Sequence, residues 1–213
     1  MIKVTYINHM GDDISVVNSA RVSFGKKSKY ECTDLVKGKW ELSRKDEKLI
    51  NYLAKHNHKS PFNHAFATFH VKAPIFVARQ LQKHEYMPWN EISRRYVDSK
   101  PEFYEPNEWR GRSADKKQGS KCVVTLSDNL MANMSKAALE DYNYLLDQGV
   151  APEQARMVLP QSMMTEWYWS GSLYAFAKMC SLRLKEDSQE ETRQVATQIY
   201  LPMIKAFPVS WKA

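Results

Sequence analysis

The spacing of hydrophobic and polar residues changes several times along the chain, and each spacing predicts a different element. Residues 1–8 alternate between apolar and polar side chains, as in a strand whose successive residues face opposite sides. Residues 65–74 combine aromatic and β-branched residues and end at Pro74, and residues 163–171 are also rich in aromatic residues. These segments are predicted to be three β-strands.

Helical spacing of apolar residues covers much of the remaining chain. Asp12 or Asp13 is a suitable N-terminal cap for the first helix, and a long helix is bounded by Ser127 or Asp128 and by Gly149. The predicted helices span residues 12–24, 44–58, 74–86, 127–149, 151–160, 172–184 and 188–207.

Two polar segments separate these elements. Residues 25–45 are basic up to the next helix and are predicted to form a surface loop, and residues 100–125 are predicted to be a mobile surface insertion. Strands and helices do not alternate regularly, and no linker or internal repeat divides the chain. We therefore expect an α+β fold in a single domain over residues 1–213.

Composition narrows the class of protein. The chain has 213 residues, 43% of them hydrophobic and 26% charged, which is typical of a globular protein with a buried core. The net charge of +7 fits an acidic partner, such as a nucleotide, a nucleic acid or an anionic surface, or simply a solvated basic surface. The chain does not begin like a signal peptide, and no apolar run reaches the roughly 20 residues that span a bilayer. We expect a cytoplasmic protein with no membrane partner.

The segment 83–97, KHEYMPWNEISRRYV, concentrates charge, aromatic surface and hydroxyl groups. The helix before it, which would begin with Pro74, carries Arg79 and Lys83 four residues apart and therefore on one face. Like charges at this spacing indicate an anion between or beyond them, or else a simple exposed basic face. Trp89 in this segment is expected to pack rather than stack on a ligand.

Metal and nucleophile chemistry are weaker alternatives. His56, His58 and His64 are a loose match to a metal-ligand set and have no neighbouring carboxylate, so no metal is expected. Cys180 lies in an apolar helical run, where a buried, inert thiol is expected, and the three cysteines include no CxxC pair. Two function classes stay open on this basis: a nucleic-acid-binding protein and a metal-dependent hydrolase.

Several segments together resemble the flavin-dependent thymidylate synthases. They are HNHKSPFNHAFATFHVKAPIFVARQ at 56–80, NEISRRY at 90–96, SARVSFGK at 19–26, ARMVLP at 155–160, SLRL at 181–184 and SQEE at 188–191. That family carries an Arg-His-Arg triplet followed by seven residues and a serine. Here the same spacing joins Lys83, His84 and Glu85 to Ser93. The resemblance covers most of the chain, and the order of the segments matches.

The resemblance implies a central mixed or antiparallel sheet flanked by helices and a homotetramer with active sites between subunits. It also implies that the chain methylates dUMP to dTMP. Methylenetetrahydrofolate would provide the carbon, and NADPH would reduce a bound FAD. No cysteine nucleophile is required, no nucleic-acid partner is expected, and another pyrimidine nucleotide is the alternative substrate.

The resemblance also implies which residues form the site. Arg183 would hold the pyrimidine edge and, with Ser93 and His58, would be catalytic. Residues implied for dUMP are Gln80, Lys83, Glu91, Ser93, Arg94, Arg95, Arg156 and Arg183. Residues implied for FAD are Ser23, Ser60, Lys83, His84, Glu85, Glu91, Ser172, Tyr174 and Lys178.

This chain departs from the family pattern at some of these positions. Glu85 reverses the charge of the last triplet position, and a pair with Arg94 is one expected consequence. Ser172 and Tyr174 lie in a segment that lacks the Asn/Arg character common in the family. Lys178, four residues beyond Tyr174, is expected to supply a compensating charge.

Overall fold

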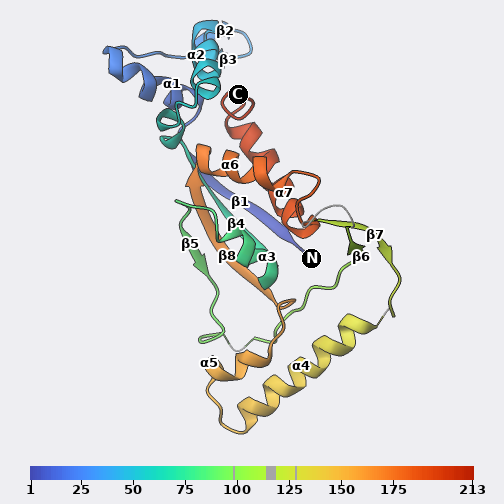
Figure 1. Ribbon diagram of the computed structural model, residues 1–213. Helices are drawn as coiled ribbons and strands as arrows, with labels where there is room; N and C mark the ends of the chain where they lie inside the picture. The colour runs from blue at the N-terminus through green and yellow to red at the C-terminus, as the bar shows by residue number, and fades with distance from the viewer. Residues whose placement is uncertain (98, 114–118, 128) are drawn as a thin grey trace.

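The computed structural model describes residues 1–97, 99–113, 119–127 and 129–213 (Figure 1). Its centre is a four-stranded sheet in the order β1-β4-β8-β5, and each neighbouring pair is antiparallel. The strands are β1 (Lys3–Met10), β4 (Phe66–Pro74), β8 (Met164–Ser172) and β5 (Trp89–Glu91). The predicted α+β class and the three predicted strands are confirmed, and the short strand β5 joins them at the edge of the sheet.

Alternate residues of β4 and β8 form the buried face of the sheet. Phe69 pairs with Trp169 and Val71 pairs with Trp167, and all four side chains are buried. Helices α6 (Leu173–Arg183) and α7 (Glu190–Ala206) lie beside the sheet and pack on it (Figure 1). Tyr168, between the two tryptophans, points to the other face and is 52% exposed. Successive side chains of β8 therefore alternate between the buried core and the exposed face of the sheet.

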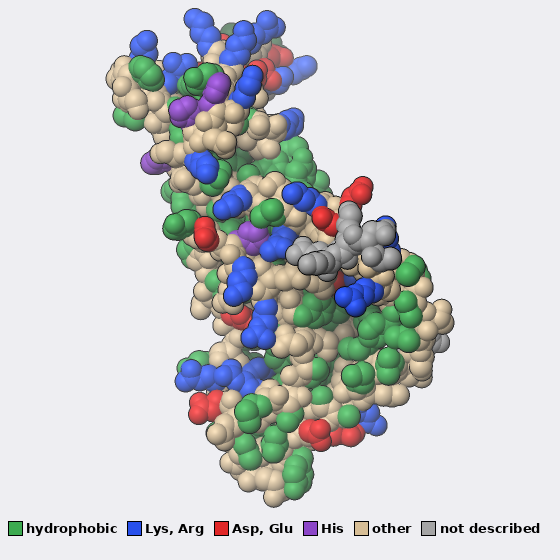
Figure 2. Space-filling view, viewed as in Figure 1, with side chains coloured by type: hydrophobic (Ala, Val, Ile, Leu, Met, Phe, Trp, Pro, Cys, Tyr) green, Lys and Arg blue, Asp and Glu red, His purple; other side chains and the backbone are tan. Residues whose placement is uncertain are grey.

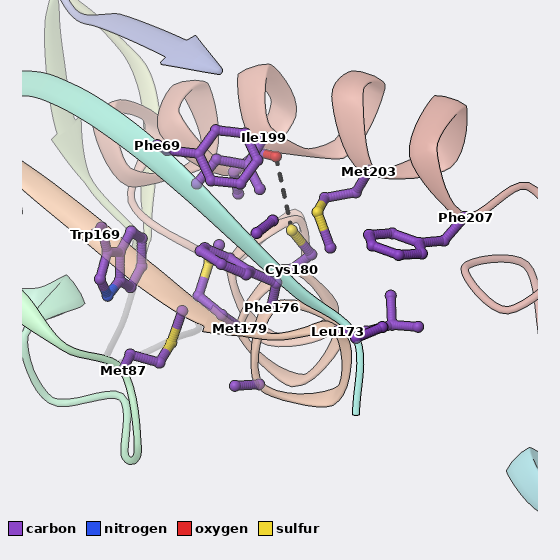
Figure 3. Close-up of a cluster of buried hydrophobic side chains, with 14 of the residues drawn as sticks. Phe69, Met87, Trp169, Leu173, Phe176, Met179, Cys180, Ile199, Met203 and Phe207 are labelled. Carbon is purple, nitrogen blue, oxygen red and sulfur yellow. Dashed lines mark hydrogen bonds between the residues drawn. The ribbon is translucent and has the colours of Figure 1, made fainter. Parts of the chain in front are cut away.

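Aromatic side chains join the sheet to α6 in the core (Figure 3). The ring of Phe176 on α6 meets Phe69 at 5.1 Å and Trp169 at 5.4 Å between centroids, both edge-on. Cys180 on the same helix donates its thiol to the carbonyl of Ala196 on α7, at 3.7 Å. Burial raises the pKa of the Cys180 thiol to about 12. The prediction of a buried, inert Cys180 is confirmed.

Two acidic residues fix the start of helix α1 (Asp13–Arg21) and its contact with the C-terminal segment. Asp12 is the cap, because its carboxylate accepts the backbone N–H of Ser15 at 3.0 Å while the Ser15 hydroxyl accepts the N–H of Asp12 at 3.1 Å. Asp13 is buried and accepts the backbone N–H groups of Val209 and Ser210, at 2.9 and 2.8 Å. Asp13 thereby ties the C-terminal segment to the first helix.

The segment predicted to be a loop, residues 25–45, instead contains a hairpin of β2 (Glu31–Asp34) and β3 (Lys39–Glu41). Its turn is local: the Asp34 carboxylate accepts the N–H groups of Val36 and Lys37, and Gly38 adopts a φ of 58°. Helix α2 (Arg44–Lys55) follows, amphipathic as predicted, but it ends before the predicted residue 58. The prediction of a surface loop was wrong, because the turn at Asp34 and Gly38 lets two strands pair within the segment.

The segment 100–125 is also more ordered than its polar sequence predicts. Strands β6 (Trp109–Arg112) and β7 (Ser120–Val124) pair antiparallel, while residues 114–118 lie outside the described chain. The guanidinium of Arg110 binds the buried carboxylate of Glu191 on α7 at 2.5 Å. This long-range ion pair could not be read from local sequence. Whether the segment is an insertion stays a prediction.

Helix α3 (Ile75–Leu81) is shorter than the predicted 74–86. Pro74 is its N-cap in extended conformation, not its first residue, and the chain turns after Leu81, with Tyr86 at a φ of 59°. Lys83 therefore lies in a turn, and the prediction that it shares a helical face with Arg79 was wrong. The turn redirects residues 83–86 away from the helix axis.

The remaining helices extend from the sheet or connect it. Helix α4 (Leu130–Asp147) lies away from the sheet in Figure 1 and ends before Gly149, as predicted. Its cap is Asn129; Asp128, one of the predicted caps, lies outside the described residues. The other elements are α5 (Pro152–Ala155), η1 (Val22–Phe24), η2 (Ser60–Asn63) and η3 (Arg156–Val158). None of the described helices has the length and apolar character needed to cross a membrane.

Candidate active site

A cavity of about 760 Å³ opens beside α6, and we name it the α6 cavity. Its walls come from η2, the turn after α3, and α6. Six of the residues predicted for FAD line it, together with Arg183 and Lys59: Lys83, His84, Glu85, Ser172, Tyr174 and Lys178. The structure thus brings together residues that are separated by about a hundred positions in the sequence.

Arg183, the last residue of α6, lines the α6 cavity and also a second one of about 660 Å³ beside α7, named the α7 cavity. Its Nε donates to His84 Nε2 at 3.1 Å, and its Nη2 donates to the carbonyl of Gln80 at 3.4 Å. Burial lowers the pKa of Arg183, but arginine stays protonated in proteins. A cation is therefore held at the junction of the two cavities.

His84 is the neutral partner of this cation. Burial lowers its pKa to about 4, and the charges of Arg183 and Lys178 add to that effect. Because Nε2 accepts a hydrogen bond from Arg183, the ring proton resides on Nδ1. His84 orients Arg183 without competing for its charge.

We expect His84 to make the protein less stable in acid. In the unfolded chain the His84 ring takes up a proton below its ordinary pKa of about 6.5, whereas in the folded chain it does so only near pH 4. The free energy of unfolding therefore falls as the pH decreases from about 6.5 to about 4. The variant His84→Gln keeps an acceptor and cannot titrate. Urea unfolding from pH 7.5 to 4 should show a shallower loss of stability for the variant. Parallel curves for the two proteins would contradict the assignment.

Gln80, predicted to bind dUMP, projects from α3 towards α7. Its side-chain amide donates to Gln189 Oε1 at 2.5 Å, and its carbonyl oxygen accepts the hydroxyl of Thr192 at 3.1 Å. It lines the α7 cavity with Arg183, Tyr104, Arg110 and Glu191. These two hydrogen bonds fix the orientation of the Gln80 side-chain amide at the wall of the α7 cavity.

Glu85 and Lys178 lie close together at the wall of the α6 cavity. Lys178 Nζ lies 3.9 Å from Glu85 Oε2, and both side chains are more than half exposed. The alternative pair of Glu85 with Arg94 is wrong, because Arg94 instead donates to the carbonyl of Ser99. The reversed charge at position 85 is therefore met by a lysine from α6.

Glu91 ends the edge strand β5 and is fixed by the sheet. One carboxylate oxygen accepts the Thr165 hydroxyl at 2.6 Å, and the other accepts Trp89 Nε1 at 3.0 Å. Trp89 stacks on Trp167 at 4.2 Å between ring centroids, so its predicted packing role is confirmed. Glu91 lines neither the α6 nor the α7 cavity of its own chain.

The other residues predicted for dUMP form a separate basic group beyond β5. Arg95 Nε lies 3.8 Å from the carboxylate of Glu153, and Arg156 Nε donates to the carbonyl of the same residue at 3.1 Å. The hydroxyl of Ser93 accepts the backbone N–H of Arg95 at 3.3 Å. We name Ser93, Arg94, Arg95 and Arg156 the basic turn. It does not line the α6 or α7 cavity.

A third group lies near the end of α2. His58 stacks on Tyr52 with 6.1 Å between centroids and lines a small cavity of about 150 Å³ with Lys59 and Tyr174. Ser60 begins η2, and Ser23 lies exposed in η1. The predicted site residues of a single chain thus form three groups: those of the two large cavities, those of the basic turn, and those near the end of α2. The last group adjoins the α6 cavity, because Lys59 and Tyr174 line both cavities.

Sequence reasoning missed residues that organise these places. Glu153 links the two arginines of the basic turn, and it stands three positions before Arg156, which is the signal that could have found it. Lys59 lines the α6 cavity and sits between two predicted site residues, His58 and Ser60. Among the described residues, no group of three or more His, Cys, Asp or Glu is placed to hold a metal ion.

The chain is similar to known proteins over most of its length. The family model described as thymidylate synthase complementing protein (Thy1) matches residues 5–209. Flavin-dependent thymidylate synthases of Thermus thermophilus and Thermosipho melanesiensis are 40% and 38% identical to this chain. The alignments cover 99% and 91% of this chain, and 74% and 81% of the relatives.

A solved structure, the UMP/dUMP methylase PolB from Streptomyces cacaoi bound with 5-Br dUMP, has the same fold. The TM-score is 0.81 at 30% identity, and the match covers 100% of this chain and 93% of that one. Fold and site together define an enzyme of the nucleotide-methylating class. The chain belongs to the family of flavin-dependent thymidylate synthases.

The α6 cavity fits the cofactor that this family implies. Three lysines and Arg183 line it against the single acid Glu85, so its charge suits the diphosphate of FAD. Figure 2 shows Lys and Arg side chains spread along this face of the molecule, from the end that carries α2 to the end that carries α5. Lys83, Ser172 and Tyr174 are the residues of the cavity wall that would hold the cofactor. The Ser172 hydroxyl also accepts the N–H of Ala175 at 3.1 Å, which fixes the start of α6.

Proposed function

We propose that this chain catalyses the reductive methylation of dUMP to dTMP. Methylenetetrahydrofolate is the carbon donor, and FAD, reduced by NADPH, supplies the hydride. The observation that carries the proposal is the position of Arg183 between two cavities, where His84 and the Gln80 carbonyl hold its guanidinium. A fixed cation at this junction suits a reaction in which a pyrimidine ring and a reducing cofactor must meet.

In this proposal Arg183 binds the N3 and O2 edge of the pyrimidine. Its donors stabilise negative charge that develops there as C5 becomes nucleophilic. Gln80, whose side-chain amide is held by Gln189 and Thr192, orients the substrate from α3, and Lys83 adds a charge nearby. The buried Cys180 takes no part, because burial raises the pKa of its thiol to about 12.

The nucleotide phosphate is assigned to the basic turn. Arginine offers a planar set of donors that matches phosphate oxygens, and exposed N–H groups of a turn add to it. Arg95 and Arg156 are held by Glu153, and Ser93 and Arg94 flank them. Glu91, fixed by Thr165 and Trp89, orients polar groups of substrate or cofactor beside this turn.

A homotetramer would bring the three groups together. The basic turn lines neither large cavity of its own chain. A single site can therefore contain a basic turn and a large cavity only if they come from two different copies of the chain. His58 and Ser60 flank Lys59, which lines the α6 cavity of the same chain, and with Ser23 they are assigned to the flavin. Light scattering of the purified protein should give the mass of four chains. A monomer that is fully active would contradict this assembly.

The proposed reaction is tested by the visible spectrum of the protein with added FAD. Bound flavin should bleach on addition of NADPH at a rate that changes with dUMP, and dTMP should appear only when methylenetetrahydrofolate is also present. A chain that holds no flavin at any FAD concentration, or that bleaches without forming dTMP, would contradict the proposal.

UMP is the second candidate substrate. The PolB structures contain 5-Br dUMP in one case and 5-Br UMP in the other, and both match this chain with TM-scores of 0.81 and 0.80. The two nucleotides differ in the ribose 2′-hydroxyl. Parallel assays with dUMP and UMP at equal concentration would identify the preferred substrate from the ratio of the two kcat/KM values.

Cys180 should matter for stability and not for turnover. The variant Cys180→Ala removes a buried sulfur that donates to Ala196 and leaves a small void, which should cost about 1–2 kcal/mol of unfolding free energy. Urea unfolding measures that loss, and the rate of dTMP formation below the unfolding range should stay within about twofold of the parent. A loss of more than a hundredfold in the rate of dTMP formation by a folded variant would mean that the Cys180 thiol takes part in the reaction.

A further inference from the structure

Lys59 has no role in the assignments above, yet it lies at the wall of the α6 cavity. It precedes η2 and lines both this cavity and the small one beside His58. Its Nζ lies 5.4 Å from the ring centroid of Tyr174, within the range in which an aromatic face attracts a cation. Lysine is a flexible point charge, so the tyrosine face gives its ammonium a preferred position.

Of the three lysines that line the α6 cavity, one has a carboxylate partner. Lys178 is opposed by Glu85 at 3.9 Å, and Glu85 is the single acid among the residues that line the cavity. Lys59 and Lys83 form no ion pair with any residue that the structure describes. The positive charge still available in the cavity therefore belongs to these two lysines and to Arg183, which is engaged with His84.

The position of the acid decides where an anion can bind. Glu85 repels an anion on its own side of the cavity and holds Lys178 there, whereas Lys59 stands on the η2 side beside Tyr174. A ligand with two linked phosphates would carry two negative charges that match two free lysines. Riboflavin has no phosphate and would use neither lysine.

We propose that Lys59 is a binding residue for the diphosphate of a flavin dinucleotide and that the Tyr174 ring positions its ammonium. The inference rests on the proposed flavin-dependent function and adds a residue that binds the diphosphate of the cofactor. The charge that position 85 lacks in this chain is thus supplied from another segment, the start of η2.

The test is a titration of the full-length flavin-free protein with FAD and, separately, with riboflavin, followed by flavin fluorescence. The variants are Lys59→Met and Lys59→Arg, with Lys55→Met as the matched control, because Lys55 is an exposed lysine of α2 that lines none of the three cavities. Lys59→Met should weaken FAD binding about tenfold, as expected for the loss of one charge-assisted contact, and leave riboflavin binding unchanged. Lys59→Arg and Lys55→Met should bind both flavins like the parent.

Tyr174 gives a second, independent variant. Tyr174→Leu removes the ring face that positions the ammonium of Lys59, so it should lose affinity for FAD more than for riboflavin. Equal FAD binding by Lys59→Met and the parent would overturn the inference. Equal weakening of FAD and riboflavin would also overturn it, because Lys59 would then act through protein structure.

Failure of the proposed function would look different. A parent protein that binds neither FAD nor riboflavin would overturn the flavin assignment as a whole, and the Lys59 inference with it. A parent that binds FAD and forms dTMP, combined with a Lys59→Met variant of unchanged FAD affinity, would overturn the Lys59 inference alone.

Discussion

Arg183→Ala should lower kcat/KM for dUMP by two to three orders of magnitude while the protein stays folded. Removing one preorganised donor from a site of developing negative charge costs about 3–4 kcal/mol of transition-state stabilisation in other enzymes. Arg183 is held for this purpose by His84 at 3.1 Å, and it lines both large cavities. Steady-state rates of dTMP formation at several dUMP concentrations would measure the loss.

The control for this prediction lies two residues further along the chain. Lys185 is an exposed cation that lines none of the three cavities, so Lys185→Ala should keep parental rates. Arg183→Lys keeps the charge but loses the planar fork, and it should recover only part of the activity. If Arg183→Ala retained more than a tenth of the parental kcat/KM, Arg183 would not be the residue that stabilises the pyrimidine charge.

Trp169→Ala should have the largest effect on stability. Its side chain is fully buried, it meets Phe176 at 5.4 Å and Trp89 at 5.7 Å, and truncation of a buried aromatic residue costs about 3–5 kcal/mol. This is a large share of the whole stability of a typical domain. Thermal and urea unfolding should show a strongly lowered midpoint, and the purified yield should fall.

The neighbouring residue on the same strand provides a matched control. Tyr168 points to the opposite face of β8 and is 52% exposed, so Tyr168→Ala should cost less than about 1 kcal/mol. Similar losses for the two variants would mean that the faces of the central sheet are not divided into core and surface as described. Trp169 also approaches His84, at 6.5 Å between centroids, so its loss should loosen the support of Arg183 as well.

Much of the fold followed from local pattern. Strands β1, β4 and β8 carry alternating or aromatic-rich sequences that suit a half-buried sheet, and α2 and α6 carry apolar faces. The predicted elements were wrong in two segments where a few turn residues decide the backbone path. The Asp34 and Gly38 turn makes a hairpin out of a lysine-rich segment, and the turn after Leu81 ends a helix that propensity would continue.

The site was only partly accessible to sequence reasoning. The resemblance named residues that line one cavity, such as Lys83 and Tyr174, because the spacing of their segments is characteristic. It could not reveal that Glu85 meets Lys178, or that Glu153 links Arg95 to Arg156. Such pairs join segments far apart or depend on side-chain direction, which no local period encodes.

The sequence by itself determined the α+β class, most of the helices and strands, and the family, because periodicity and motif spacing are properties of the chain order. The tertiary structure alone decided that Arg183 stands between two cavities, that Lys59 faces Tyr174, and that the basic turn lies apart from both large cavities. The physical reason is that burial, charge pairing and cavity shape arise from contacts between distant segments. Those contacts form only when the sheet and its helices pack together.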